Sequence, residues 1–352
     1  MIKTKRIGVL TPGGDAPGMN AAVRAVTYAA SNHGVEVMGV LRGYSGLMDG
    51  DVKRLDLHDV ENIICNGGTI LYSDRCPAFK TEDGMQRAVA TCRAHSLDGI
   101  VVIGGDGSLR GAGDLSARGI PCIVLPCTIN NDIVSTDNAI GFDTAMNTVI
   151  EMADRLRVSC ESHACCNVVE VMGRDAGDIA VQTGVATGAV GVAIPEVPFD
   201  YPALIRKIKK ERATGKRNFI VIVSEGMGST FSQKLVGDIQ KDIGEVTRFA
   251  RLAHVIRGGR PGLRDRLLAS RFGEVAVNSF CEGKVNLVVG ECNGEIVTTD
   301  INRALALNEM YKHHFDRADG YTSEQATEMK AYCRRKTAFI RALYETCNRL
   351  SM

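Results

Sequence analysis

Short apolar runs rich in valine and isoleucine alternate with longer helical patterns along almost the whole chain. This alternation is typical of βαβ units, in which a helix connects two parallel strands. Strands are expected at residues 6–11, 35–41, 99–103, 120–125, 167–171, 191–194, 218–223, 247–254 and 285–289. Helices are expected at residues 19–33, 84–95, 108–117, 142–158, 175–186, 201–213, 231–242, 262–280, 301–313 and 323–350. Since 352 residues suffice for about two domains and no linker separates them, we predict two interleaved, doubly wound α/β domains with mainly parallel sheets.

The charge balance excludes some classes of partner. Lysine and arginine number 42 against 41 aspartates and glutamates, a net charge of +1. Proteins that bind nucleic acid or anionic membranes usually carry a strong positive excess, so we expect neither partner. No stretch approaches the roughly 18 apolar residues of a membrane span. The N-terminus has no signal-peptide pattern, which favours the cytoplasm.

The chain has twelve cysteines, which could form disulfides, bind metal or lie buried as thiols. They are scattered through apolar segments, no CxxC motif occurs, and a chain of this length needs no disulfides. The adjacent Cys165 and Cys166 follow His163 closely, which raises the alternative of a zinc site. We expect reduced, mostly buried thiols.

Glycines are frequent, 38 in all, and several of them follow expected strands. Three such turns are Thr11 to Gly18, Gly104 to Ser108 and Met172 to Gly177. In open α/β sheets ligands bind where strands end, and helix N-termini there can hold phosphate. Each turn alone could be an ordinary tight turn. Together, each with an acid or a base, they indicate phosphate sites, although neither GxxxxGKS/T nor GxGxxG is present.

The second turn also offers a carboxylate. Asp106 lies between Gly105 and Gly107, next to Ser108. Mg²⁺ on a nucleotide prefers one or two carboxylates together with phosphate oxygens. This turn therefore predicts Mg²⁺–nucleotide binding, with a plain turn-forming role for Asp106 as the alternative.

Two further polar segments follow expected strands. The loop at 126–133 could hold an acceptor hydroxyl, and its polar residues are Thr128, Asn130, Asn131 and Asp132. A basic cluster follows later and consists of Arg248, His254 and Arg257. Arginines bind phosphate through paired hydrogen bonds, so this cluster could hold a second phosphate. A simple turn and solvated surface charges are the alternatives.

Several segments together resemble the phosphofructokinase family, in its bacterial ATP-dependent type. They are GVLTPGGDAPGMNAA, VVIGGDGS, TINNDI followed by IGFDTA, VVEVMGR and HVIRGG. They occur in the family's order and spacing, and the resemblance covers about residues 5 to 310. It implies a glycolytic kinase that transfers the γ-phosphoryl of ATP to the 1-hydroxyl of fructose 6-phosphate or a related sugar phosphate, usually as a homotetramer.

The resemblance also implies how the two domains divide and which residues bind. A nucleotide-binding domain would comprise residues 1–138 and about 256–305, and a sugar-phosphate domain 139–255 and about 306–352. The ATP positions are Gly14, Arg75, Cys76, Gly105, Asp106, Gly107 and Ser108, with Asp106 on Mg²⁺. The sugar-phosphate positions are Thr128, Met172, Gly173, Arg174, Glu225, His254, Arg257 and, from a neighbouring subunit, Arg248. The catalytic positions are Thr128, Asn130, Asp132 and Arg174.

Two residues depart from the family where the chemistry occurs. Asn130 stands where the family has the aspartate that takes the proton of the acceptor hydroxyl. An amide is not basic near pH 7, and losing a general base typically costs about 10²–10⁴-fold in rate. Asp132 could substitute as the proton acceptor. Cys165 replaces an arginine that contacts the sugar's 6-phosphate.

The family's marker positions for donor and effectors are also altered. Gly107 favours ATP, because a carboxylate there would crowd the nucleotide, whereas Cys127 matches neither ATP nor pyrophosphate users. Effector positions keep Arg24, Arg157 and Lys216, while Tyr28, Leu57, Val190 and Thr214 replace charged residues. We expect weak or absent regulation by ADP and phosphoenolpyruvate.

These departures leave two main hypotheses. The first is an active ATP-dependent kinase. The second is a non-catalytic paralogue that binds nucleotide and sugar phosphate as a regulatory or structural subunit. Pyrophosphate as the donor is a third alternative.

Overall fold

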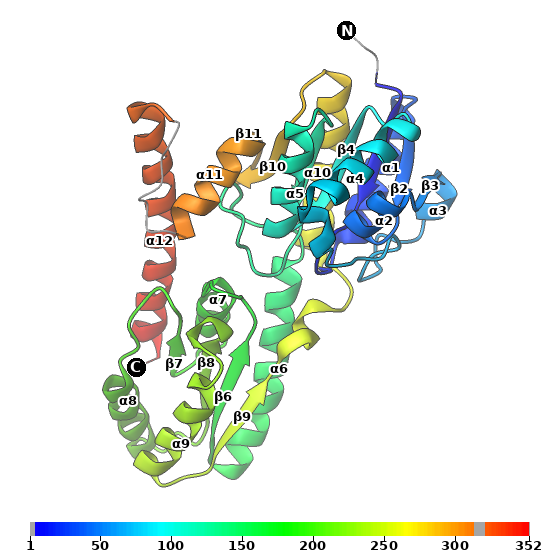
Figure 1. The fold of residues 1–352 in the computed structure, drawn as a ribbon. Coiled ribbons are helices and arrows are strands. Elements are labelled where there is room, and N and C mark those ends of the chain that lie inside the picture. Colours follow the sequence, from blue (N-terminus) through cyan, green and yellow to red (C-terminus); the bar gives the residue numbers. More distant parts are fainter. Residues whose placement is uncertain (1–3, 313–320, 352) are drawn as a thin grey trace. The chain divides into compact units, whose positions relative to one another are not determined.

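The computed structural model describes residues 4–312 and 321–351, which divide into two compact units (Figure 1). Of these residues, unit 1 takes those up to Thr144 and from Arg257 to Lys330, and unit 2 takes the remainder. From the sequence we expected the chain to pass from one domain to the other at residues 138, 255 and about 305. The third expected position differs most from the structure, because helix α11 (Ile301–Lys312) packs against α5 (Asp106–Ala117) of unit 1.

Unit 1 is built on a seven-stranded sheet with the order β11-β10-β5-β4-β1-β2-β3. Its strands are β1 (Arg6–Leu10), β2 (Glu36–Val40), β3 (Val52–Leu55), β4 (Gly99–Gly104), β5 (Cys122–Pro126), β10 (Leu287–Cys292) and β11 (Glu295–Asp300). The five inner strands are parallel, and β3 and β11 pair antiparallel at the two edges. Besides α5 and α11, its helical elements are α1 (Met19–Asn32), α2 (Gly43–Asp49), α3 (Leu57–Val60), the 3₁₀ turn η1 (Pro77–Lys80), α4 (Glu82–Ala94) and α10 (Leu263–Cys281).

The core of unit 1 follows from its buried parallel strands. Every residue of β4 is buried, as expected for a strand covered on both faces. Helices α2, α4 and α5 cover one face through a single apolar cluster that includes Leu10, Ile100 and Leu109. Helices α1 and α10 pack against each other. The loops that follow β1, β4 and β5 are thereby fixed along one edge of the sheet, the edge formed by the carboxyl ends of these parallel strands.

Unit 2 contains a four-stranded parallel sheet with the order β7-β8-β6-β9. Its strands are β6 (Cys166–Val171), β7 (Gly191–Ala193), β8 (Phe219–Ser224) and β9 (Thr247–Arg251). Its helices are α7 (Asp178–Ala186), α8 (Tyr201–Ala213), the 3₁₀ turn η2 (Glu225–Met227) and α9 (Phe231–Ile243). Helix α6 (Phe142–His163), the 3₁₀ turn η3 (Ala253–Arg257) and α12 (Ser323–Leu350) contain residues of both units.

The expected strands and helices are all present within a few residues. A capping box precedes α12, since Gln325 N donates to Thr322 Oγ1 at 3.2 Å and Thr322 N donates to Gln325 Oε1 at 3.1 Å. The expected strand up to His254 was too long. It ends at Arg251, and His254 lies in η3, whose first residue, Ala253, has a positive φ of 44°. The predicted end of helix 301–313 lies outside the described residues.

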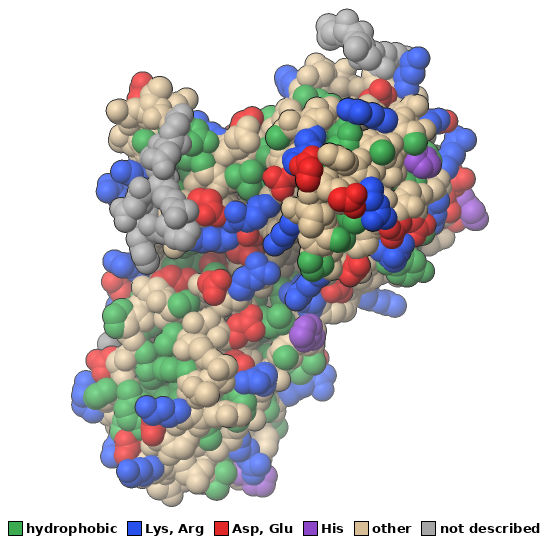
Figure 2. All heavy atoms as spheres, in the orientation of Figure 1, with side chains coloured by type: hydrophobic (Ala, Val, Ile, Leu, Met, Phe, Trp, Pro, Cys, Tyr) green, Lys and Arg blue, Asp and Glu red, His purple; other side chains and the backbone are tan. Residues whose placement is uncertain are grey.

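The surface carries both signs of charge. Figure 2 shows acidic and basic side chains interspersed on the visible face. None of the helices in the described parts of the chain is long and apolar enough to cross a membrane.

Candidate active site

Three of the predicted loops follow β1, β4 and β5, which are neighbours in the sheet of unit 1. Ser108 Oγ donates to Pro12 O at 2.8 Å, which joins the second loop to the first. A Cβ on Gly105 would lie 3.3 Å from the Cβ of Thr128, so the second loop also approaches the third. The structure therefore brings the two glycine loops and the loop of Asn130 together at one edge of the sheet.

Arg257 reaches the first loop from far along the chain. Its Nη1 donates to the backbone oxygen of Asp15 at 2.7 Å. A Cβ on Gly14 would lie only 2.6 Å from the same nitrogen. A side chain at Gly14 would therefore displace Arg257, which explains why a glycine suits this position.

The predicted ATP residues Arg75 and Cys76 lie beside the same loop. Gly13 N donates to Asp74 O at 3.0 Å and so holds this segment in place. Arg75 is exposed, whereas Cys76 is half-buried with its Sγ 3.6 Å from Met48 Sδ. Arg75 thus presents a positive charge to solvent near the loop.

Asp106, the predicted metal ligand, begins α5 and is 7% exposed. Its Oδ1 accepts from Asn308 Nδ2 at 3.0 Å, and its Oδ2 accepts from Lys312 Nζ at 2.8 Å and Arg110 Nε at 3.3 Å. Burial raises the pKa of Asp106, but these partners outweigh burial, so the pKa lies below its usual value. Asp106 is therefore an ionised, largely buried carboxylate with two cationic partners.

Two residues of this site, Asn308 and Lys312, were missed in the sequence. They are four residues apart on α11 and so share one face of the helix. Asn308 is fully buried, and its Oδ1 accepts from Val134 N at 2.8 Å while its Nδ2 donates to Asp106. It thus links the Asp106 loop to the Asn130 loop. The sequence offered one weak signal for these two residues, an asparagine in an expected helix followed one turn later by a lysine.

Asn130, at the family's base position, is 5% exposed. Its backbone N–H donates to Thr128 Oγ1 at 3.2 Å. Its side-chain Oδ1 is buried and has no hydrogen-bond partner among the described residues. Such an oxygen is costly unless a ligand or water pairs with it. It can accept a hydrogen bond from an acceptor hydroxyl but, as an amide, cannot take up its proton. Asp132 lies two residues further on and is half-buried.

The two donor-marker positions differ in their surroundings. A Cβ on Gly107 would meet no heavy atom of the described residues within 4 Å. Cys127 is fully buried, forms a β-bridge with Ile140, and burial raises the pKa of its thiol. Gly107 therefore leaves space beside the 104–108 loop, and Cys127 contributes no charge.

In unit 2, the predicted sugar-phosphate loop follows β6. Glu225 Oε1 accepts from Gly173 N at 3.1 Å and from Arg174 N at 2.8 Å. Both residues have positive φ, 151° at Gly173 and 55° at Arg174. Glu225 thus fixes an unusual backbone that leaves Met172 half-buried and the Arg174 side chain exposed.

The remaining predicted residues of unit 2 lie after or on β9. Arg248, on β9, and His254, in η3, are both exposed. Cys165, at the position of the family's arginine, is 1% exposed, and its Sγ lies 3.3 Å from Cys160 Sγ. The burial of Cys160 raises the pKa of its thiol to about 12. Cys165 is therefore buried and lacks the guanidinium group that the family's arginine would offer to a phosphate.

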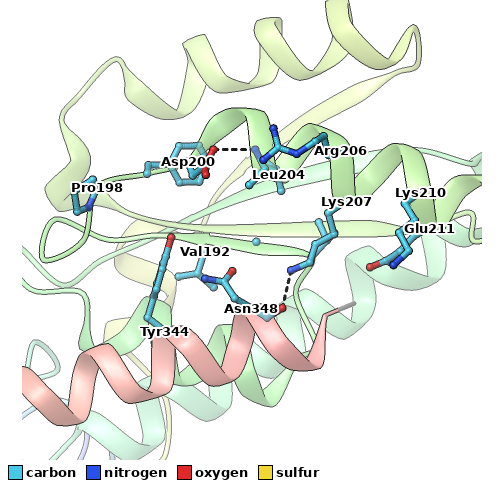
Figure 3. Close-up of a pocket in the computed structure, with 14 residues that line it drawn as sticks. Val192, Pro198, Asp200, Leu204, Arg206, Lys207, Lys210, Glu211, Tyr344 and Asn348 are labelled. Atoms are coloured by element: carbon cyan, nitrogen blue, oxygen red, sulfur yellow. Dashed lines mark hydrogen bonds between the residues drawn. The ribbon is translucent and has the colours of Figure 1, made fainter.

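Unit 2 also contains a cavity of about 520 Å³ whose lining includes none of the predicted site residues (Figure 3). It lies between α8, β7 and the C-terminal part of α12, with Val192, Leu204 and Tyr344 in its wall. Lys207 Nζ donates to Asn348 O at 3.1 Å and so joins α8 to the end of α12 (Figure 3). The shape of this cavity therefore depends on how α12 is held.

Comparison with known proteins decides the family. The sequence profile described as Phosphofructokinase matches residues 6–280. The chain belongs to the phosphofructokinase family. The ATP-dependent 6-phosphofructokinase of Brevibacillus brevis is 49% identical over 312 residues, which are 89% of this chain and 96% of that relative. The phosphofructokinase of the same name from Bacillus subtilis is 48% identical over 299 residues, 84% of this chain and 92% of the relative.

Solved phosphofructokinases have the same fold. The phosphofructokinase of Saccharomyces cerevisiae superposes with a TM-score of 0.84 at 30% identity and covers 97% of this chain. This chain spans 50% of the yeast chain. A pyrophosphate-dependent phosphofructokinase from Marinobacter aquaeolei gives a TM-score of 0.75 at 22% identity over 94% of this chain and 91% of its own. At this identity, the similarity to the Marinobacter aquaeolei structure shows a shared fold alone.

Proposed function

We propose that this phosphofructokinase-family chain transfers the γ-phosphoryl of ATP to the 1-hydroxyl of fructose 6-phosphate. The observation that carries the proposal is the meeting of three loops at one sheet edge: the first glycine loop, the Asp106 loop and the Asn130 loop. Phosphoryl transfer depends mainly on positioning and charge neutralisation. The names of two relatives that this chain matches nearly from end to end, ATP-dependent 6-phosphofructokinase, support these substrates.

ATP binding is assigned to unit 1. The backbone of Gly14 and of residues 105–108 can approach the phosphates closely, because glycines line both loops. Helix α5 begins within the 105–108 segment, and its N-terminus favours negative charge. Arg75 supplies a positive charge beside the first loop, and the space next to Gly107 suits a nucleotide better than pyrophosphate.

Sugar-phosphate binding is assigned mainly to unit 2. The predicted positions with exposed arginine or histidine side chains suit a phosphate, and they are Arg174, His254 and, from a neighbouring subunit, Arg248. Glu225 and Gly173 shape the loop of Arg174, and Met172 precedes it. The family resemblance also names Thr128 and Arg257 as sugar-phosphate residues, and both belong to unit 1.

The family resemblance implies Mg²⁺ at Asp106, where the metal would neutralise charge on the phosphates of ATP. A carboxylate at the start of a helix, directly after a glycine loop, is the ligand type that Mg²⁺ prefers. In this chain, however, both carboxylate oxygens of Asp106 already accept hydrogen bonds. The residue type is one that Mg²⁺ prefers, but the surroundings of Asp106 do not fit the metal, because Lys312 lies on Oδ2 and Asn308 on Oδ1.

Asn130 makes reduced turnover the expected form of this activity. Its amide can orient the acceptor hydroxyl, while the half-buried Asp132 is the nearest carboxylate in sequence that could accept the proton. The same observation favours a second candidate function, a paralogue that binds both substrates without turnover. The buried Cys165 also favours this second candidate, because it lacks the positive charge of the family's arginine.

An assay of ATP turnover with fructose 6-phosphate tests both candidates. We expect wild-type turnover to be low, and Asn130→Asp to raise kcat by about 10²–10⁴-fold, because an aspartate can act as the base. Asn130→Ala is the matched control, and it should stay at or below the wild-type rate. Wild-type turnover at the level of the Bacillus subtilis enzyme would remove the second candidate. A silent wild type whose Asn130→Asp variant is active would establish it.

The donor is tested in the same assay. Replacing ATP by pyrophosphate should give no turnover with either the wild type or Asn130→Asp. For the assembly we expect a cytoplasmic homotetramer, since the family resemblance implies it. Light scattering after gel filtration should then give the mass of four chains of 37.8 kDa.

A further inference from the structure

We propose that the ammonium group of Lys312 takes the place of Mg²⁺ at Asp106, so that this chain binds ATP without metal and Lys312 competes with metal for the carboxylate. The inference rests on the proposed function, because it assumes that ATP phosphates lie at the 104–108 loop. It makes Lys312 a residue that determines the metal dependence of nucleotide binding.

The first argument is that Lys312 and Mg²⁺ need the same oxygen. Lys312 Nζ lies 2.8 Å from Asp106 Oδ2, and Arg110 Nε lies 3.3 Å from it. Oδ1 accepts from Asn308 Nδ2 at 3.0 Å. Mg²⁺ sits about 2.0–2.1 Å from its oxygen ligands in near-ideal octahedral geometry. A metal at that distance would be in contact with two positively charged groups, so it can bind only after Lys312 has moved away.

The second argument is that this ion pair is built into the fold. The side chain of Asp106 is only 8% exposed, and that of Lys312 is 35% exposed. The fully buried Asn308, one turn before Lys312, fixes the same helix face against Asp106 and against Val134 N. A carboxylate this far from water interacts more strongly with a cation than an exposed one does. The pair is therefore stronger than a typical surface salt bridge.

The third argument is charge. Arg110 pairs with both Asp106 and Glu309, and Lys312 pairs with Asp106. These two cations and two carboxylates balance to zero, so the cluster offers a divalent cation no net attraction. It does place an ammonium and a guanidinium beside the loop where phosphates would bind. Those two groups can supply the positive charge that the metal supplies elsewhere.

Calorimetric titration with ATP, once in MgCl₂ and once in EDTA, tests the proposal without relying on activity. We expect the wild type to bind ATP in EDTA at least as tightly as in MgCl₂. Lys312→Met should lose about tenfold or more in affinity in EDTA and gain about tenfold in MgCl₂, as expected for one charge-assisted contact. Lys312→Arg should behave like the wild type. Lys284→Met is the matched control, because Lys284 forms an exposed pair with Glu282 at 2.8 Å, and it should change nothing.

Each other outcome is decisive. If Lys312→Met, shown to be folded by its thermal unfolding midpoint, binds ATP like the wild type in both buffers, Lys312 is only a surface ion pair and the proposal fails. If EDTA abolishes ATP binding by the wild type, the proposal also fails, while the proposed function stands. If the wild type binds ATP in neither buffer, both are overturned.

Discussion

At Gly107 the fold does not require the absence of a side chain. Its backbone is outside the left-handed region, and in the described parts of the chain an added Cβ would touch nothing within 4 Å. Gly107→Asp should therefore leave the thermal unfolding midpoint unchanged. It should weaken ATP binding by at least about tenfold, because the new carboxylate would face the phosphates. Titration calorimetry measures this effect.

Gly107→Ala is the control, since it adds the Cβ without the charge, and it should bind ATP within a few-fold of the wild type. Unchanged ATP affinity in Gly107→Asp would mean that the phosphates do not lie at the 104–108 loop.

The residues of the site differ in how visible they are in the sequence. Asp106 and Gly107 could be predicted because a strand, a glycine turn and a helix follow one another within a few residues. The partners of Asp106 could not. Asn308 and Lys312 lie 202 and 206 residues away, and their contact exists only because α11 packs on α5. No local pattern carries that information.

At the scale of elements, the long helices and buried strands were predictable because each has its own periodicity or apolar run. Short edge elements were missed. Strand β3 has two exposed charged residues among its four, so it is a strand only because it pairs with β2. Strand β11 is equally polar, although the Asn293–Gly294 pair before it is typical of a two-residue hairpin turn.

Lys207 joins helix α8 to the C-terminal end of α12. Lys207 Nζ donates to Asn348 O at 3.1 Å and to Ser351 Oγ at 2.5 Å, at the negative end of the helix. Burial lowers the pKa of Lys207, so the cost of removing its ammonium group from water offsets part of the stability that these hydrogen bonds contribute. We expect Lys207→Met to lower the free energy of unfolding by about 1 kcal/mol in urea denaturation.

Lys209→Met is the matched control, because Lys209 is exposed on the same helix, and it should change stability by less than about 0.5 kcal/mol. Equal stability of the two variants would show that the packing of α12 does not depend on Lys207.

At the scale of the whole molecule, the α/β class and the interleaving of two units follow from the order of strands and helices. The positions at which the chain passes from one unit to the other do not follow from that order. The chain passes between them inside α6 and α12, two uninterrupted helices whose periodicity gives no sign of a boundary. The packing of α11 on α5, β10 and β11 assigns residues 306–312 to unit 1.

Regulation is the property of the whole molecule for which the structure gives a definite expectation. The cations at the family's effector positions already have partners within the chain. Arg157 Nη1 donates to Asn218 Oδ1 at 2.9 Å, Lys216 pairs with Glu211, and the Arg24 guanidinium lies 4.1 Å from the centre of the Tyr28 ring. An effector phosphate would have to break these contacts and would find Val190, which is 2% exposed, where the family has a charged residue.

We therefore predict that ADP and phosphoenolpyruvate change neither the rate nor the fructose 6-phosphate dependence by more than about twofold. Steady-state rates measured across a titration of each effector check this, with a regulated bacterial phosphofructokinase assayed in parallel. If the wild type proves silent, the Asn130→Asp variant takes its place, because Asn130 belongs to the sheet edge of unit 1 and not to the effector positions. A sigmoidal dependence on fructose 6-phosphate that either compound shifts would show that Arg157 and Lys216 exchange their internal partners for an effector.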